Sequence, residues 1–287
     1  MKVIIIYNPN STGDSETNAK NLAQQLKAAH VDVVTKKTTH AGHGEEIAAK
    51  LAKENEDVVL VSSSGDGGYH EVVNGTLAQG SSKLVVGVLA SGNANDHASS
   101  IGSDSLAKAI IHKDFHHIDT IKVSSTMHGK PWVRYAHSYV GIGVTANAAK
   151  KLTEDRPNIL TEKWIVARSL LSFKYVKIQE NNEPKRFSSM LFGNIEKMSK
   201  VIKLSDGSSV TDGKFEMSSI RFHSKLRLVA YLISAATIGL KKSRSLSKYE
   251  CETLKPLPIQ LDGEVYVLDA QSTLVIESVR RNLHCVL

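Results

Sequence analysis

The stretch Val58–Glu71, VVLVSSSGDGGYHE, limits the fold of this chain more than any other segment. Its β-branched run Val58–Val61 predicts a buried strand, and the glycine-rich Ser62–Gly68 predicts a sharp turn at the end of that strand. A helix is expected from Tyr69 onward. Because backbone N–H groups at a helix N-terminus stabilise an anion, the segment predicts a phosphate-binding loop.

One carboxylate, Asp66, lies in this turn and cannot bind a phosphate directly. A carboxylate beside a phosphate usually has a divalent cation between them, so the segment predicts a nucleotide–Mg²⁺ loop. For Gly-Asp-Gly alone, an ordinary strand-to-helix turn of an α/β protein is an equal alternative. The dinucleotide fingerprint is incomplete because position 70 is not glycine, and no G-x-x-x-x-G-K-[ST] motif occurs.

Two more apolar strands are expected to end in loops of small residues. Val3–Tyr7 leads into Asn8–Gly13 (NPNSTG), and Leu84–Leu89 leads into Ala90–Asp96 (ASGNAND). Three such loops would meet at the carboxyl edge of one parallel sheet, where open α/β sheets bind their ligands.

These motifs resemble those of the diacylglycerol and sphingosine lipid kinase family, close to its soluble bacterial members. The family carries N-P-x-S-G, G-G-D-G-T-x-x-E-V-x-N-G and G-T-x-N-D in this order, and this chain has NPNSTG, SGDGGYHEVVNG and GNAND at similar spacing. A fourth match is Asp262-Gly263-Glu264, where the family has D-G-E. Four ordered motifs over almost the whole chain are far more specific than any one of them.

The resemblance implies an ATP- and Mg²⁺-dependent kinase. Phosphoryl transfer needs a positioned γ-phosphoryl group, a metal ion to neutralise its charge and a base for the acceptor hydroxyl. By resemblance, the nucleotide site comprises Asn8, Pro9, Asn10, Ser11, Thr12, Thr38, Gly65, Asp66, Gly67, Gly68, Glu71 and Asn93. The catalytic Mg²⁺ would be held, largely through water, by Asp66, Asp96 and Asp119. A structural ion would be held by Asp212 with the backbone carbonyls of Ser209 and Lys214, although Asp-Gly is also an ordinary turn signal.

The resemblance makes Asp262 the general base. Glu264, two residues further along an expected strand, should point to the same face. Taken alone, Asp262-Gly263 is more typical of a hairpin turn, and its place in the ordered motif set favours the catalytic interpretation.

The chain departs from the family at several positions. Gly68 and Asn93 stand where the family has threonines that donate to the phosphates, and Ser64 replaces the first glycine of the second motif. Lys197–Lys200 replaces a glycine-rich stretch. These departures concern substrate identity and rate more than nucleotide binding.

The sequence pattern changes near residue 120. Residues 1–120 are expected to form a doubly wound α/β nucleotide-binding domain with helices over Ser15–Ala29 and Gly44–Lys53. Residues 121–274 are expected to form a β-sandwich-like substrate domain, and by resemblance 275–287 returns to the first domain, with the active cleft between the two. The expected strands of the second domain are Trp132–Val140, Ser188–Asn194, Lys214–Arg221, Pro258–Leu268 and Ser272–Val279, and its expected helices are Thr161–Phe173 and Lys225–Leu240.

Composition fits a globular protein, with 41% hydrophobic and 23% charged residues among 287. Two cysteines and no secretory signal predict free thiols in a reducing cytoplasm. Neither these cysteines nor His112, His116 and His117 have the spacing of a metal site.

The net charge of +7 suggests an anionic partner. Arg221–Lys248 holds seven Lys or Arg and no acidic residue, around the apolar run Leu226–Leu240, which is too short and too charged to span a bilayer. It is typical of a core helix with a solvated basic end, and the alternative is a surface that docks on anionic lipid. No recognition helix or aromatic-rich strand accompanies the charge, so nucleic acid is not an expected partner.

The sequence therefore predicts a cytoplasmic lipid kinase that associates peripherally with the membrane and phosphorylates diacylglycerol. The alternatives are a kinase for another lipid or soluble hydroxyl compound, including an NAD-kinase-like activity, and a catalytically silent nucleotide-binding regulator. The retained Asp66, Asp96, Asp262 and Glu264 argue against a silent regulator. A homodimer stays open.

Overall fold

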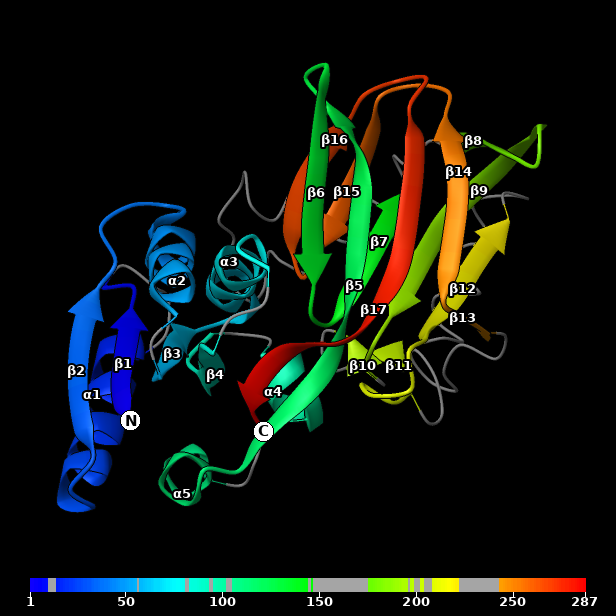
Figure 1. The fold of residues 1–287 in the computed structure, drawn as a ribbon. Helices are drawn as coiled ribbons and strands as arrows, with labels where there is room; N and C mark the ends of the chain where they lie inside the picture. Colours follow the sequence, from blue (N-terminus) through cyan, green and yellow to red (C-terminus); the bar gives the residue numbers. More distant parts are fainter. Residues whose placement is uncertain are drawn as a thin grey trace. The chain divides into compact units, whose positions relative to one another are not determined.

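A computed structural model describes residues 1–9, 14–55, 57–80, 83–92, 95–101, 105–143, 146, 175–195, 197–198, 202–203, 208–221 and 243–287. The chain divides into two compact units (Figure 1). Unit 1 comprises Met1–Thr120, Val210–Asp212 and Val279–Leu287, and unit 2 comprises Ile121–Ser209 and Gly213–Ser278. The expected helices over 161–173 and 225–240 lie outside the described residues.

Unit 1 is built on a parallel sheet in the order β2-β1-β3-β4-β17. Its strands are β1 (Lys2–Tyr7), β2 (Asp32–Lys37), β3 (Val58–Ser64), β4 (Val85–Ala90) and the end of β17 (Thr273–Val286). Its helices are α1 (Ser15–Ala28), α2 (His43–Glu54), α3 (Asp66–Leu77), α4 (Asp96–Ile101) and α5 (Leu106–His112).

Helices cover both faces of this sheet because its strands are apolar on both faces. Alternate residues of β1, Val3 and Ile5, pack in one cluster with Leu22 of α1 and Ile110 of α5. The intervening Ile4 and Ile6 are also buried, and Gly44 of α2 lies against Ile6. Strands without a polar face are typical of a parallel sheet covered on both sides. The predicted α/β fold class, with a doubly wound first domain, is confirmed.

The strand order reverses between β1 and β3, and this reversal creates the switch point at which open α/β sheets bind ligands. β1 pairs with β2 on one side and with β3 on the other. The loops that follow β1 and β3 therefore leave from adjacent strands at the carboxyl edge.

The predicted turn over Ser62–Gly68 is wrong in its extent. Strand β3 continues through Ser64, helix α3 begins at Asp66, and Gly65 alone separates them. The serines continue the strand because their backbone pairs with the neighbouring strands β1 and β4. Their hydroxyl groups also find buried partners: Ser63 Oγ donates to the Ser15 carbonyl at 2.7 Å, and the Ser62 and Ser64 Oγ atoms lie 2.8 Å apart.

Unit 2 consists of antiparallel strands around one apolar core, as expected of a sandwich-like domain. Its strands are β5 (Phe115–Met127), β6 (Lys130–Ala136), β7 (Tyr139–Gly143), β8 (Val176–Glu180), β9 (Glu183–Gly193), β10 (Lys197–Met198), β11 (Ile202–Lys203), β12 (Phe215–Arg221), β13 (Ser243–Leu246), β14 (Lys248–Thr253), β15 (Leu257–Leu261), β16 (Glu264–Leu268) and the first part of β17. In the core, the Phe192 ring packs on those of Phe215 and Tyr249.

Two segments that the sequence predicted as single strands are each divided. Pro258–Leu268 forms the hairpin β15–β16, because Asp262 and Gly263 both have positive φ (51° and 102°) and make a two-residue turn. Trp132–Val140 is divided between β6 and β7 at His137–Ser138. These two residues leave the strand because their N–H groups donate to the Asp262 carboxylate.

No helix among the described residues is long and apolar enough to cross a membrane.

Candidate active site

In unit 1 the second and third sequence motifs are packed backbone to backbone. A Cβ built on Gly92 would lie 2.9 Å from the Gly65 nitrogen, closer than side chains approach, so residue 92 has to be glycine. The Ser91 N–H donates to the Ser64 carbonyl at 3.0 Å. The loop after β4 is thereby held against the start of α3.

Asp66 joins these two motifs chemically. Its carboxylate accepts hydrogen bonds from the N–H groups of Asp96 at 3.0 Å and His97 at 3.2 Å, the first two residues of α4. The Asn95 side chain closes the loop, since Oδ1 accepts from Gly92 N at 2.9 Å and Nδ2 donates to Gly92 O at 2.6 Å. Two of the three predicted ligands of the catalytic Mg²⁺, Asp66 and Asp96, therefore lie together.

The Asp66 carboxylate suits indirect binding of Mg²⁺. A carboxylate has about four lone-pair sites, so Asp66 keeps acceptor capacity beyond its two backbone hydrogen bonds. Among the residues that the structure describes, no three His, Cys, Asp or Glu side chains are grouped to hold a metal ion directly. Mg²⁺ at Asp66 and Asp96 would need water and nucleotide phosphates as its other ligands, which is its usual behaviour.

The Glu71 side chain of α3 is hydrogen-bonded to backbone N–H groups. Its carboxylate accepts from Gly42 N at 2.8 Å and from Gly44 N at 3.0 Å, so it fixes the loop between β2 and α2. Thr38, at the start of this loop, donates from its N–H to the Tyr7 carbonyl at 2.8 Å. Thr38 and Glu71, both predicted to bind the nucleotide, thus hold the two ends of the loop between β2 and α2. Thr38 bonds the start of this loop to the end of β1, and Glu71 bonds its other end to α3.

The loop after β1 is described only in part. The Asn8 carbonyl accepts a hydrogen bond from Ser15 Oγ at 2.7 Å, which connects this loop to the first turn of α1, and Pro9 follows. The remaining predicted residues of this group, Asn10, Ser11 and Thr12, lie outside the described residues, as does Asn93.

Asp119, the third predicted ligand of the catalytic Mg²⁺, is fully buried in unit 1. Its Oδ1 accepts from Arg281 N at 2.7 Å, and its own N–H donates to the Val210 carbonyl at 2.6 Å. Val210 is followed by Thr211 and by Asp212, the predicted ligand of the structural ion, whose side chain is exposed. Ser209 and Lys214 are described as parts of unit 2.

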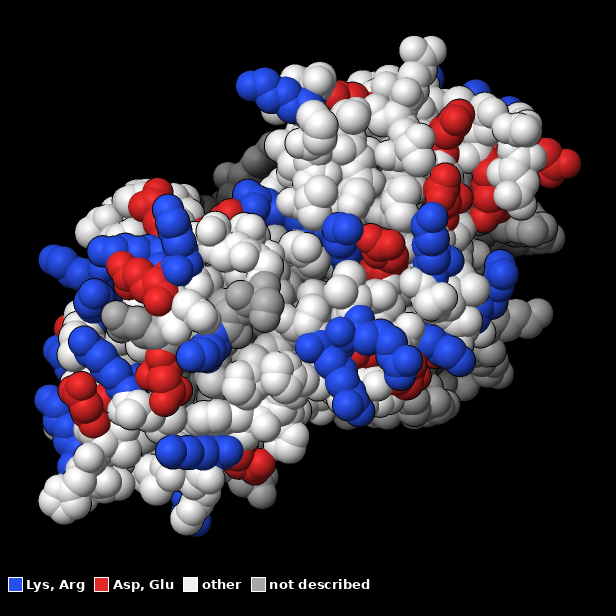
Figure 2. Space-filling view, viewed as in Figure 1, with Lys and Arg blue, Asp and Glu red and all other residues white. Residues whose placement is uncertain are grey.

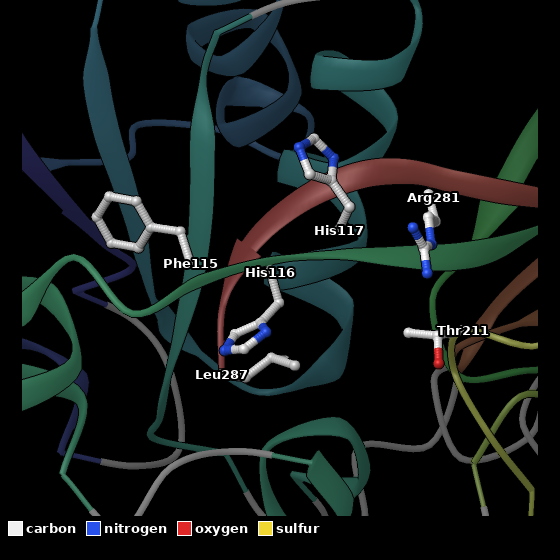
Figure 3. Close-up of a pocket in the computed structure, with 6 residues that line it drawn as sticks. All are labelled: Phe115, His116, His117, Thr211, Arg281 and Leu287. Carbon is white, nitrogen blue, oxygen red and sulfur yellow. The ribbon is translucent and has the colours of Figure 1, made fainter.

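A cavity of about 590 Å³ lies in unit 1, and the sequence did not predict it. It is lined by Phe115, His116, His117, Thr211, Arg281 and Leu287 (Figure 3). His116 and His117 lie in β5 and extend to opposite sides of that strand. In the sequence, only the adjacent histidines His116 and His117 pointed to this region. That Arg281 lines the same cavity follows from the fold and not from the sequence.

The His117 ring stacks on His284, with centroids 4.3 Å apart and an interplanar angle of 7°. Burial lowers the pKa of His284, and the nearby His117 and His116 lower it further. His116 is paired with Asp114 at 2.8 Å.

In unit 2 the predicted base Asp262 is enclosed. Its side chain is 0% exposed and accepts three backbone hydrogen bonds, from His137 N at 3.0 Å, Ser138 N at 2.9 Å and Tyr139 N at 3.1 Å. His137 Nε2 lies 3.4 Å from Oδ2 of this carboxylate, and His137 Nδ1 lies 2.7 Å from Ser138 Oγ. Three N–H donors replace hydrogen bonds that this buried carboxylate would otherwise make to water.

The expectation that Asp262 and Glu264 share a face is wrong. Asp262 belongs to the hairpin turn and is buried, whereas Glu264 begins β16 and is exposed. The same-face argument assumed a continuous strand, and the two positive φ values interrupt it. A base must reach the proton that it abstracts, so catalysis by Asp262 stays a prediction.

The fold and the start of α3 place this chain in the class of doubly wound α/β proteins, which bind their ligands at the carboxyl edge of the sheet. Within that class, residues 2–123 match the family model "Diacylglycerol kinase catalytic domain". The resemblance inferred from the motifs is confirmed over these residues.

Solved structures agree on the fold. The chain is similar to a diacylglycerol kinase from Bacillus anthracis str. Sterne, with a TM-score of 0.72 and 19% identity over 99% of this chain and 96% of that one. It is also similar to yeast NADH kinase in complex with NADH, with a TM-score of 0.50 and 11% identity over 100% of this chain and 83% of that one. No curated protein matches the chain. Together the comparisons support a kinase.

Proposed function

We propose that this protein is an ATP- and Mg²⁺-dependent lipid kinase that converts diacylglycerol to phosphatidic acid. The observation that carries the proposal is Asp66, which lies at the start of α3 and is bonded to the first N–H groups of α4. This arrangement lies within the part of the chain that matches the diacylglycerol kinase catalytic domain. It combines backbone donors for phosphate with carboxylates for a metal ion.

The chemistry follows from that arrangement. The first N–H groups of α3 have no acceptor within the helix and would bind the nucleotide phosphates. Asp66 and Asp96 would hold Mg²⁺ through water beside those phosphates, and Mg²⁺ supplies charge neutralisation during transfer. In this proposal Asp119 is the third carboxylate that holds Mg²⁺ through water, and Asp262 is the general base.

We base the proposed lipid acceptor and the proposed binding to an anionic membrane surface on the charge of the chain. Basic and acidic side chains of the described residues are interspersed over most of the face in Figure 2. The strongest basic segment of the sequence, Arg221–Lys248, lies mostly outside the described residues. Membrane docking and cytoplasmic localisation are therefore proposed from the sequence charge of +7 and from the resemblance.

An assay of ATP consumption against a panel of acceptors tests the proposal. The panel contains diacylglycerol in anionic and neutral vesicles, sphingosine, glycerol and NAD. We expect Mg²⁺-dependent turnover with diacylglycerol that is faster on anionic vesicles. Turnover with NAD alone would replace the lipid assignment, and bound ATP without turnover on any acceptor would favour the regulator.

The variant Gly67→Val tests the phosphate loop itself. A β-branched side chain in the first turn of α3 should block the approach of phosphate to the backbone and weaken ATP binding at least about tenfold. Ala78→Val, at the exposed end of the same helix, is the matched control. Equal ATP affinity in both folded variants, measured by calorimetry, would remove this loop from the site.

A further inference from the structure

The loop between β2 and α2 carries two histidines whose rings are stacked. The His40 and His43 centroids are 4.8 Å apart, and the interplanar angle is 10°. The loop lies at the end of the sheet toward which the β1 and β2 arrows point (Figure 1). This is the carboxyl edge, where the phosphate loop also begins.

Hydrogen bonds hold both rings in place. Thr39 Oγ1 lies 2.9 Å from His40 Nδ1 and 3.1 Å from His43 Nδ1. The Thr39 N–H also donates to His43 Nδ1 at 3.1 Å, and His40 Nε2 lies 3.1 Å from Glu46 Oε1. A flat aromatic surface that is already ordered loses little conformational entropy when a ligand stacks on it.

This histidine pair is connected to the helix of the phosphate loop. Gly42 and Gly44, on either side of His43, donate their N–H groups to Glu71 of α3. Asp66 begins that helix five residues earlier, which corresponds to a rise of about 7.5 Å. The stacked rings are thus held near the helix whose first turn would bind phosphate.

We propose that His40 and His43 form a platform on which the purine base of the bound nucleotide stacks. The His40 side chain is 53% exposed, so its face away from His43 can receive a base. Stacking between a base and an aromatic side chain stabilises binding because both carry a π face. The inference rests on the proposed function, since it requires that the chain binds ATP.

Calorimetry with two ligands separates base from phosphate recognition. We expect His40→Ala to weaken ATP binding about tenfold while leaving the affinity for inorganic tripolyphosphate, which has no base, unchanged. His40→Phe, which keeps an aromatic face, should recover most of the ATP affinity. His112→Ala, which removes an exposed histidine at the end of α5, is the control and should bind both ligands as the original chain does.

A fluorescence measurement gives a direct readout of stacking. In His40→Trp, ATP should quench the added indole emission, and tripolyphosphate should not. Equal ATP affinity in the original chain and His40→Ala, or no quenching in an ATP-bound His40→Trp, would overturn the platform and leave the kinase assignment intact. Failure of the original chain to bind ATP would instead contradict the proposed function itself.

Discussion

Gly68 is the residue at which this chain differs most informatively from the family motif. A Cβ built on Gly68 would lie 2.6 Å from both Cβ and Oγ of Ser64. Ser64 Oγ is in turn hydrogen-bonded to Ser62 Oγ at 2.8 Å and to the Gly65 carbonyl at 2.9 Å. The two departures from the motif, serine at 64 and glycine at 68, therefore depend on each other sterically.

We expect Gly68→Thr to destabilise unit 1 by about 1–3 kcal/mol, the usual range for overpacking, rather than to raise turnover. Adding Ser64→Gly to Gly68→Thr should recover most of that loss, because Ser64→Gly removes the Cβ and Oγ atoms with which the threonine clashes. Urea unfolding of the four proteins of this cycle measures the coupling. Additive effects of the two changes would show that the sites are independent.

Asp262 has a structural role whatever its catalytic role is. Asp262→Asn replaces one acceptor oxygen by an NH₂ group, which must face a backbone N–H donor in a fully buried site. We expect a loss of about 1–3 kcal/mol in the free energy of unfolding. Loss of turnover in this variant is therefore interpretable only together with a melting curve.

Asp269 offers the matched comparison for Asp262. It accepts N–H groups from Gly129 and His128 in the same way but is only partly buried, and these hydrogen bonds lower its pKa. Asp269→Asn should cost less stability than Asp262→Asn, because solvent can hydrate the new amide. A larger loss at Asp269 would contradict the assigned importance of burial.

At the scale of elements, α2 and α3 pack closely through a glycine. A Cβ on Gly75 of α3 would overlap the Glu45 carbonyl of α2 and lie 2.9 Å from the Ala48 Cβ. Together with the Glu71 bonds, this contact sets where α3 lies, and α3 carries the phosphate loop.

The sign of the change in stability caused by Gly75→Ala tests this close contact. In an exposed helix interior this change stabilises by up to about 1 kcal/mol, whereas here we expect a loss of about 1–3 kcal/mol from overpacking. Gln24→Ala, at an exposed position of α1, serves as the control and should be nearly neutral. Increased thermal stability of Gly75→Ala would disprove the close contact between α2 and α3.

At the scale of the whole molecule, each unit contains one buried thiol, Cys285 in unit 1 and Cys251 in unit 2. Burial raises the pKa of both thiols to about 12. Because this exceeds the pKa of an unfolded thiol, about 8.5, the associated stability is present below that value and is lost as pH rises toward 12.

The two thiols should therefore resist a disulfide reagent at pH 8 in the native protein and react fully in urea. The added thiol of Lys50→Cys, at an exposed position of α2, should react at once under the same conditions. Rapid native reaction of either original thiol would show that its unit opens readily or that its burial is wrong.

The sequence by itself determined part of unit 1, the strands β1, β3 and β4 and the helices α1, α2 and α3, because apolar runs and glycine turns act locally. Val3–Tyr7 and Ser15–Ala29 were predicted within one residue of the observed β1 and α1. The glycine-rich turn pointed to Asp66, and the family resemblance pointed to Asp96. The structure places these two residues next to each other.

Only the tertiary structure decided what depends on partners far along the chain. Ser62–Ser64 continue a strand because Ser15 and neighbouring strands satisfy them, and Trp132–Val140 is interrupted because Asp262, more than 100 residues later, takes the N–H groups at the break. The stacked pair of His40 and His43 likewise depends on Glu71, which holds their loop. Local pattern fixes which residues can form an element, but hydrogen bonds between distant residues fix where it ends and what it binds.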